Sequence, residues 1–174
     1  IDRIHFSGET MEILGPTTDP QPIPELPDVY HRFEPGSSLK GWSLNGSFGS
    51  GRNGLSLRAD STLISKTPFE GDFTAEYNVT SISEGGQAGA VFAYADPENG
   101  GICLFDPAEQ KVIIEITVNG ETTRTEAATI RSFGENTDFG CLQALQIERS
   151  GTDYIFYMND RLVCSVNDSA LSGG

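Results

Sequence analysis

Acidic side chains are the residues of this sequence best suited to chemistry. Glycoside hydrolysis needs two carboxylates, one as acid and one as base or nucleophile, roughly 5–10 Å apart. The candidates are Glu76, Asp96, Glu98, Asp106 and Glu115. The chain has 25 Asp and Glu residues, and no flanking signature distinguishes these five. We interpret them as solvated carboxylates and predict no catalytic residue.

Other catalytic arrangements find little support in the sequence. A Ser–His–Asp triad needs a histidine beside its nucleophile, but His5 and His31 both lie in the N-terminal segment. The sequence contains no Gly-x-Ser-x-Gly motif, no phosphate-binding loop and no dinucleotide-binding fingerprint. These observations favour a non-catalytic module.

One acidic loop has residue types that suit a metal. Asp96, Glu98 and Asn99, with a nearby backbone carbonyl, offer the oxygen ligands that calcium prefers. The spacing does not match an EF-hand, and an acidic turn exposed to water is the alternative interpretation. We predict that no cofactor is required, and we keep a structural calcium ion as an option.

The three cysteines, Cys103, Cys141 and Cys164, are far apart in sequence and show no C-x-x-C spacing. This argues against a zinc site and against a scaffold built on disulfides. We predict small buried hydrophobic residues. A Cys141–Cys164 bridge is the alternative, because these residues flank the two ends of a predicted strand meander.

The net charge of −14 restricts the choice of partner. Nucleic acids and anionic membranes are bound through clustered Lys or Arg, and the sequence has no such cluster. Nor does it contain the ~18 consecutive apolar residues of a membrane span. Neutral ligands such as sugars carry no electrostatic penalty, and Asp, Glu, Asn and Gln supply groups that hydroxyls bind.

The clearest structural unit is a meander of three strands at 142–147, 154–158 and 162–166. The turn-forming dipeptides Ser150-Gly151 and Asn159-Asp160 separate them. The second strand has apolar residues on both faces, with Tyr154, Phe156 and Met158 on one side and Ile155 and Tyr157 on the other. This strand is therefore predicted to be central, with its second face either covered by a loop or carrying a ligand.

Further strands follow from alternation and turns. Residues 72–80 alternate strictly, which predicts a buried face with Phe73, Tyr77 and Val79 and an exposed face with Glu76. Asn119-Gly120 predicts a hairpin of strands 111–118 and 121–126. Other predicted strands are 90–95, 101–106, 55–58 and 62–65, with a glycine-rich loop at 49–54. The fold class is therefore predicted to be all-β, a sandwich of two antiparallel sheets.

The N-terminal region has a different character. Residues 4–6 and 11–14 predict two short strands, and a proline-rich stretch follows at 15–27. We divide the chain into an N-terminal strand and linker region (1–29) and a β-sandwich domain (30–174). The first residue is Ile, so we expect a segment of a longer protein. We expect residues 1–14 to add a strand to an open sheet edge, with a loose tail as the alternative.

The order of several short motifs resembles a known family. These motifs are Gly41-Trp42, Gly54-Leu55, Gly71-Asp72-Phe73, Ala88-Gly89-Ala90-Val91-Phe92, Asp106, Leu145–Arg149 with Ser150-Gly151, and Tyr157-Met158-Asn159-Asp160. Over residues 33–174 the chain resembles concanavalin A-like, laminin G-like jelly rolls, and among them the family-66 carbohydrate-binding modules. The resemblance implies a lectin-like jelly roll that binds fructan and accompanies a glycoside hydrolase. It departs at Ala93, where the family has a basic residue, and at Ile102-Cys103, where it has aromatics.

The resemblance also implies a secreted or cell-surface location and a polysaccharide or oligosaccharide partner, beside neighbouring domains of a longer chain. Aromatic faces stack on sugar rings, and polar side chains bind hydroxyl groups. The predicted ligand-binding residues are Trp42, Tyr94 and Tyr154 for stacking, and Glu76, Asn78, Asp96, Asn99 and Arg149 for polar contacts. For Trp42, a place in the core is the alternative. Two other functions remain open, an adhesive module that docks a protein domain and a glycoside hydrolase.

Overall fold

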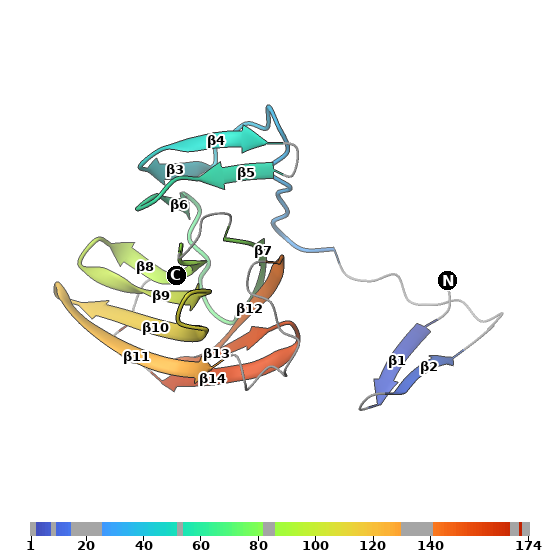
Figure 1. Cartoon of the computed structure of the whole chain (residues 1–174). Helices are drawn as coiled ribbons and strands as arrows, with labels where there is room; N and C mark the ends of the chain where they lie inside the picture. Colours follow the sequence, from blue (N-terminus) through green and yellow to red (C-terminus); the bar gives the residue numbers. More distant parts are fainter. Residues whose placement is uncertain are drawn as a thin grey trace. The chain divides into compact units, whose positions relative to one another are not determined.

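Two four-stranded antiparallel sheets form the main part of the chain in the computed structural model (Figure 1). The structure describes residues 3–7, 10–14, 26–51, 54–81, 86–129, 141–167 and 171. The first sheet has the order β11 (Glu121–Thr129), β10 (Lys111–Val118), β9 (Asn99–Asp106), β8 (Ala88–Asp96). The second has the order β14 (Arg161–Asn167), β13 (Asp153–Met158), β12 (Gln143–Ser150), β7 (Phe73–Val79). The predicted all-β sandwich of two antiparallel sheets is confirmed.

The core lies between these two sheets. Phe92 of β8 contacts two rings of β13, with centroids 5.2 Å from Tyr154 and 4.9 Å from Phe156. Residues at alternate positions of β9, β10 and β12 are buried in the same cluster. Burial of these apolar side chains is the main stabilising contribution of the sandwich.

Turn chemistry explains why consecutive strands pair. The β10–β11 turn has positive φ at Asn119 (51°) and Gly120 (79°), and the β13–β14 turn has it at Asn159 (51°) and Asp160 (61°). Two consecutive residues with positive φ match the right-handed twist of the flanking strands. The predicted meander and the predicted 111–126 hairpin are therefore confirmed.

The strand β7 follows the predicted register. Its side chains alternate between partly buried and exposed positions, with Glu76 exposed and Phe73, Tyr77 and Val79 packed against the core. Its partner is β12, in which Gln146 aligns with Glu76. The second sheet thus presents one polar face away from the core.

Two short strand pairs precede the sandwich strands in the sequence. β3 (Trp42–Asn45) pairs with β6 (Thr62–Ser65), and β4 (Phe48–Gly51) pairs with β5 (Gly54–Leu57). The loop predicted at 49–54 is therefore wrong at its first residues, which belong to β4. Phe48 aligns with Leu57, and this aromatic–aliphatic cross-strand pair favours a hairpin despite the glycines.

The N-terminal strands form a hairpin of their own. β1 (Arg3–Ser7) pairs with β2 (Thr10–Leu14) as a two-stranded sheet. The two predicted strands are confirmed and they pair with each other, and the addition of this segment to an open sheet edge stays a prediction. Only two residues separate β1 and β2, so local pairing has the smallest loop-closure entropy. The chain divides into two compact units, Ile1–Phe33 and Glu34–Gly174, and most contacts between residues fall within one unit.

The cysteines only partly follow the prediction. None of the three forms a disulfide, and Cys141 is exposed rather than buried. Burial raises the pKa of the Cys103 thiol to about 12, with a smaller contribution from Cys164, and burial raises that of Cys164 to about 11. Both thiols therefore stay protonated at neutral pH and behave as core residues.

Candidate functional site

The face of the second sheet that points away from the core carries aligned polar rows. Thr74 of β7 aligns with Glu148 of β12, which aligns with Ile155 of β13. A second row lies two residues further along the strands. It consists of Glu76 of β7, Gln146 of β12, Tyr157 of β13 and Leu162 of β14. We call the four strands' polar side the outer face. It combines hydrogen-bonding groups with aliphatic and aromatic surface.

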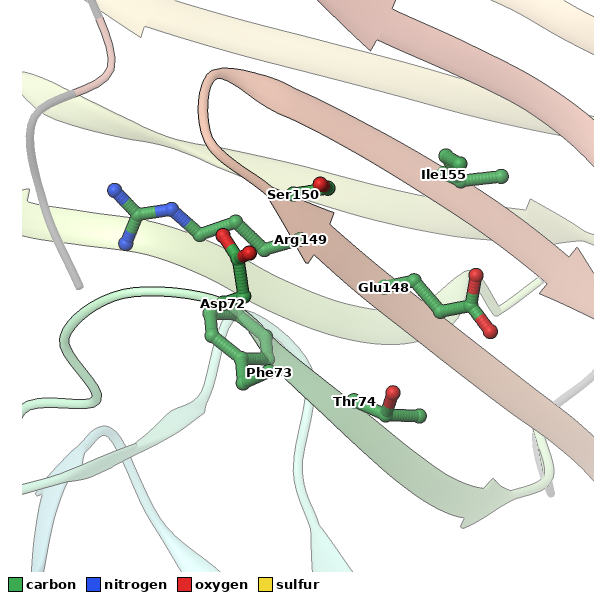
Figure 2. A pocket seen from close by; sticks show the side chains of 7 residues that line it. All are labelled: Asp72, Phe73, Thr74, Glu148, Arg149, Ser150 and Ile155. Atoms are coloured by element: carbon green, nitrogen blue, oxygen red, sulfur yellow. The ribbon is translucent and has the colours of Figure 1, made fainter.

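A shallow depression of about 380 Å³ lies where β7 begins and β12 ends. Figure 2 shows Thr74, Glu148 and Ile155 on three neighbouring strands, with Asp72 and Arg149 toward one end. Its lining combines one guanidinium, two carboxylates, two hydroxyls and two apolar side chains: Asp72, Phe73, Thr74, Glu148, Arg149, Ser150 and Ile155. Such a mixture can bind several hydroxyl groups and one apolar surface of the same small ligand.

Arg149 supplies the cationic group of the depression. Its Nε donates a hydrogen bond to the Gly151 carbonyl oxygen at 3.2 Å, and its guanidinium lies 5.7 Å from the Tyr154 ring centroid. These contacts hold the side chain in place. Among the described residues, its two terminal nitrogens have no hydrogen bond or ion pair. The remaining N–H groups can therefore donate to a ligand.

Asp72 links the two strands that form the depression through a hydrogen bond. Its Oδ1 accepts a hydrogen bond from the Gly151 backbone N–H at 2.7 Å. This bond ties the start of β7 to the β12–β13 turn. Within the described part of the chain, Oδ2 has no donor, so it can accept a hydrogen bond from a ligand hydroxyl.

Glu148 is held by two side chains of the outer face. Gln146 Nε2 donates to Oε1 at 2.8 Å, and the Tyr157 hydroxyl donates to Oε2 at 3.2 Å. Burial raises the pKa of Tyr157, and the hydrogen bond and charge of Glu148 raise it further. The phenol therefore stays protonated and remains a donor at neutral pH. The network orients all three side chains before a ligand arrives.

Four of the residues predicted to bind a ligand lie on this sheet, and three of them, unlike Tyr154, are not buried in the core. Arg149 lines the depression, and Glu76 and Asn78 are exposed on β7. Glu76 belongs to the row that adjoins the depression. The structure therefore brings these three residues, together with the buried Tyr154 of β13, onto one sheet and leaves the other four elsewhere.

Tyr94, Asp96 and Asn99 lie together at the β8–β9 turn, where the structure gives two of them another role. Asp96 Oδ1 accepts hydrogen bonds from the Glu98 backbone N–H at 2.8 Å and from Asn99 Nδ2 at 3.0 Å. Asn99 Oδ1 accepts from the Asn119 backbone N–H at 3.0 Å. These bonds pin the β8–β9 turn to the β10–β11 turn, so the polar groups are already engaged. Tyr94 is 36% exposed.

The same turn was the predicted calcium site. No group of three or more His, Cys, Asp or Glu side chains suitable for a metal occurs in the described ranges. The Asp96 carboxylate instead accepts hydrogen bonds within its own turn. This geometry favours the interpretation of an acidic turn, and calcium binding stays a prediction.

Two predicted stacking residues are placed differently. Tyr154 is 1% exposed in the core, so its ring cannot stack on a sugar, and that prediction is wrong. The alternation of β13 directs Tyr154 inward and Tyr157 outward, so Tyr157 is the tyrosine of this strand that faces the outer side. Trp42 is partly buried on β3 and aligns with Ser65.

Asp106, one of the acidic candidates, closes the β9–β10 turn. Its 5% exposed carboxylate accepts hydrogen bonds from Gln87 Nε2 at 2.8 Å and from the backbone N–H groups of Ala108 and Glu109 at 2.9 Å each. Burial alone would raise its pKa, but these bonds and the charge of Arg124 lower it below the ordinary value. The group therefore has a structural role.

We expect Asp106→Asn to lower the free energy of unfolding by roughly 1–3 kcal/mol at pH 7, because the lost charge weakens three hydrogen bonds. The folded-state pKa is lowered, so this contribution is present above the ordinary Asp pKa and is lost as the pH falls through the folded-state value. Urea unfolding at pH 7 and near pH 3 measures the difference, which should shrink in acid. The exposed Asp160→Asn is the control, and an equal loss at both pH values would contradict the assignment.

Sequence reasoning missed Asp72, Thr74, Glu148 and Ser150 as site residues. The alternation of 72–80 already placed Thr74 on the same face as Glu76. Glu148 lies two residues after Gln146, so the alternation of β12 places both side chains on one face. The sequence alone did not show that the strands carrying Thr74 and Glu148 pair with each other. The register of β7 with β12 shows that these two residues are direct neighbours.

The fold and site place the chain in the class of antiparallel β-sandwich proteins with a polar sheet face. No protein-family model and no curated protein matches the sequence. Among solved structures, the chain is similar to the carbohydrate-binding module CBM66 from Bacillus subtilis, with 27% sequence identity and a TM-score of 0.65. The match covers 77% of this chain and 83% of that chain. It confirms the resemblance found in the sequence.

One of the two departures from the resembled family, Ala93, has a structural explanation. Ala93 is 5% exposed and has φ of 49°, at a break in the β8–β9 register between Phe92 and Asp96. A long basic side chain at this position would have to leave the core.

The described ranges contain no helix that is long and apolar enough to span a membrane.

Proposed function

We propose that this chain is a non-catalytic module that binds a neutral carbohydrate at the depression between β7 and β12. The observation that carries the proposal is the similarity to a carbohydrate-binding module over 77% of the chain, at 27% identity. The depression offers what sugar binding needs, namely donors on Arg149, acceptors on Asp72 and Glu148, and apolar surface on Ile155.

Charge favours a neutral sugar over an anionic one. The chain has a net charge of −14, and two carboxylates line the depression beside its single cation. A uronate or sulfate group would face repulsion from Asp72 and Glu148, whereas hydroxyl groups can donate to both. Fructan is the first candidate, because the sequence motifs resemble those of fructan-binding modules.

The same resemblance suggests the biological context. We propose that the module is appended to a glycoside hydrolase, is secreted or displayed on the cell surface, and holds the enzyme near its polysaccharide. The carboxylates of the depression support binding rather than hydrolysis, because Glu148 accepts hydrogen bonds at both of its oxygens and Asp72 is tied to the turn.

A glycan array followed by calorimetric titration tests the proposal. We expect binding to fructans or another neutral polysaccharide, and no binding to anionic polysaccharides. Chromogenic glycosides should not be hydrolysed. Absence of any neutral hit would reject sugar binding, and turnover of a glycoside would identify an enzyme instead.

A further inference from the structure

Beside the depression, the second row of the outer face is built like an additional contact surface. Tyr157 of β13 aligns with Gln146 of β12 and with Leu162 of β14. Leu162 is 64% exposed, and Tyr157 and Ile155 are partly exposed. An aromatic ring beside exposed aliphatic surface and fixed amide and carboxylate groups suits a flat ligand with hydroxyl edges.

This row is continuous with the depression. The Tyr157 hydroxyl and Gln146 Nε2 both donate to Glu148, which lines the depression. Adjacent rows on one sheet face are two residues apart, which is about 7 Å along the strand. A ligand unit in the depression therefore has the Tyr157 row next to it, with Glu148 shared between the two positions.

We propose that the outer face forms a second subsite around Tyr157, so that the protein binds an oligosaccharide chain rather than a single sugar unit. This inference rests on the proposed sugar-binding function. The unit in the depression contacts Arg149 and Asp72, and the next unit packs on Tyr157 with its hydroxyls toward Gln146 and Glu76. Affinity therefore rises with chain length up to the point at which both subsites are filled.

Titration calorimetry with fructo-, xylo-, cello- and arabino-oligosaccharides, each from the monosaccharide to the pentasaccharide, tests this inference. For the series that binds, we expect affinity to rise about tenfold from the monosaccharide to the longer oligomers, because aromatic stacking contributes that much. Equal affinity at all lengths would overturn the second subsite and leave the proposed function intact. No binding in any series would overturn both.

Variants locate the second subsite. Tyr157→Ala and Tyr157→Phe both lose the hydrogen bond to Glu148, so both should lower the monosaccharide affinity to the same extent. Tyr157→Ala should in addition remove most of the gain with length, whereas Tyr157→Phe keeps the ring and should keep most of that gain. The control is Phe48→Ala, an aromatic residue that is 46% exposed on β4. Thermal unfolding verifies that each variant is folded. A Tyr157→Ala variant with the full gain in affinity with length would place the second contact elsewhere and reject the inference.

Discussion

Arg149→Ala is expected to bind the sugar about a hundredfold more weakly than the wild-type chain, because hydrogen bonds from a charged donor are among the strongest in a binding site. The side chain is already held by the Gly151 carbonyl and the Tyr154 ring, so binding costs little additional side-chain entropy. Calorimetric titration with the best ligand of the glycan array measures the loss.

The matched control is Arg124→Ala. Arg124 lies on β11 of the first sheet and pairs with Glu115 at 3.4 Å, with a side chain that is 52% exposed. Its removal takes away the same charge and should leave the affinity unchanged. Equal losses in both variants would mean that overall charge decides binding. Full affinity of Arg149→Ala would exclude the depression as the site.

The second large effect is expected from Gly89→Ala. A Cβ atom at Gly89 would overlap the carbonyl oxygen of Cys103 and lie 2.8 Å from the Cys103 carbonyl carbon and 2.9 Å from Leu104 Cα. All three atoms are backbone atoms of β9, so no side-chain rotation relieves the overlap. We expect β8 and β9 to separate locally, at a cost of about 3 kcal/mol or more in the free energy of unfolding.

Gly41→Ala is the matched control, since a Cβ atom there would meet no atom within 4 Å. Urea unfolding of the two variants measures the difference, with expression as soluble protein as the first sign. Wild-type stability of Gly89→Ala would show that β8 and β9 can move apart without loss. The expected result gives a physical reason for the glycine of the motif Ala88-Gly89-Ala90-Val91-Phe92.

Most of the fold followed from local signals. The hairpins at Asn119-Gly120 and Asn159-Asp160 were predictable because their turn residues adopt positive φ at little cost. The strict alternation of β7 determined its buried and exposed faces. β4 was not predicted, because its glycines read as a loop and its stabilising partner, Leu57 opposite Phe48, became visible only with the pairing.

The candidate site was predictable only in part. Strand alternation placed Glu76 and Asn78 on the exposed face of β7, whereas Arg149 aligns with Phe73 and Tyr154 and reaches the depression because it lies near the end of β12. Ligand binding by these three residues stays a prediction. Tyr154 was assigned to the ligand although β13 has aromatic residues on both faces, and alternation alone does not say which face is the core. Asp72 and Glu148 come from strands that are neighbours only through long-range pairing, which local sequence patterns do not contain.

The pairing of β7 with β12 also bears on the order in which the parts of the chain fold. Within the two four-stranded sheets, neighbouring strands are consecutive in the sequence except for β7 and β12, and the Asp72–Gly151 hydrogen bond joins residues 79 positions apart. Contacts of such high sequence separation form after local hairpins, because the loop entropy must be overcome first. We therefore expect the depression to form after the local hairpins. A ligand that bridges β7 and β12 would bind only the finished sandwich and would stabilise all of it by mass action.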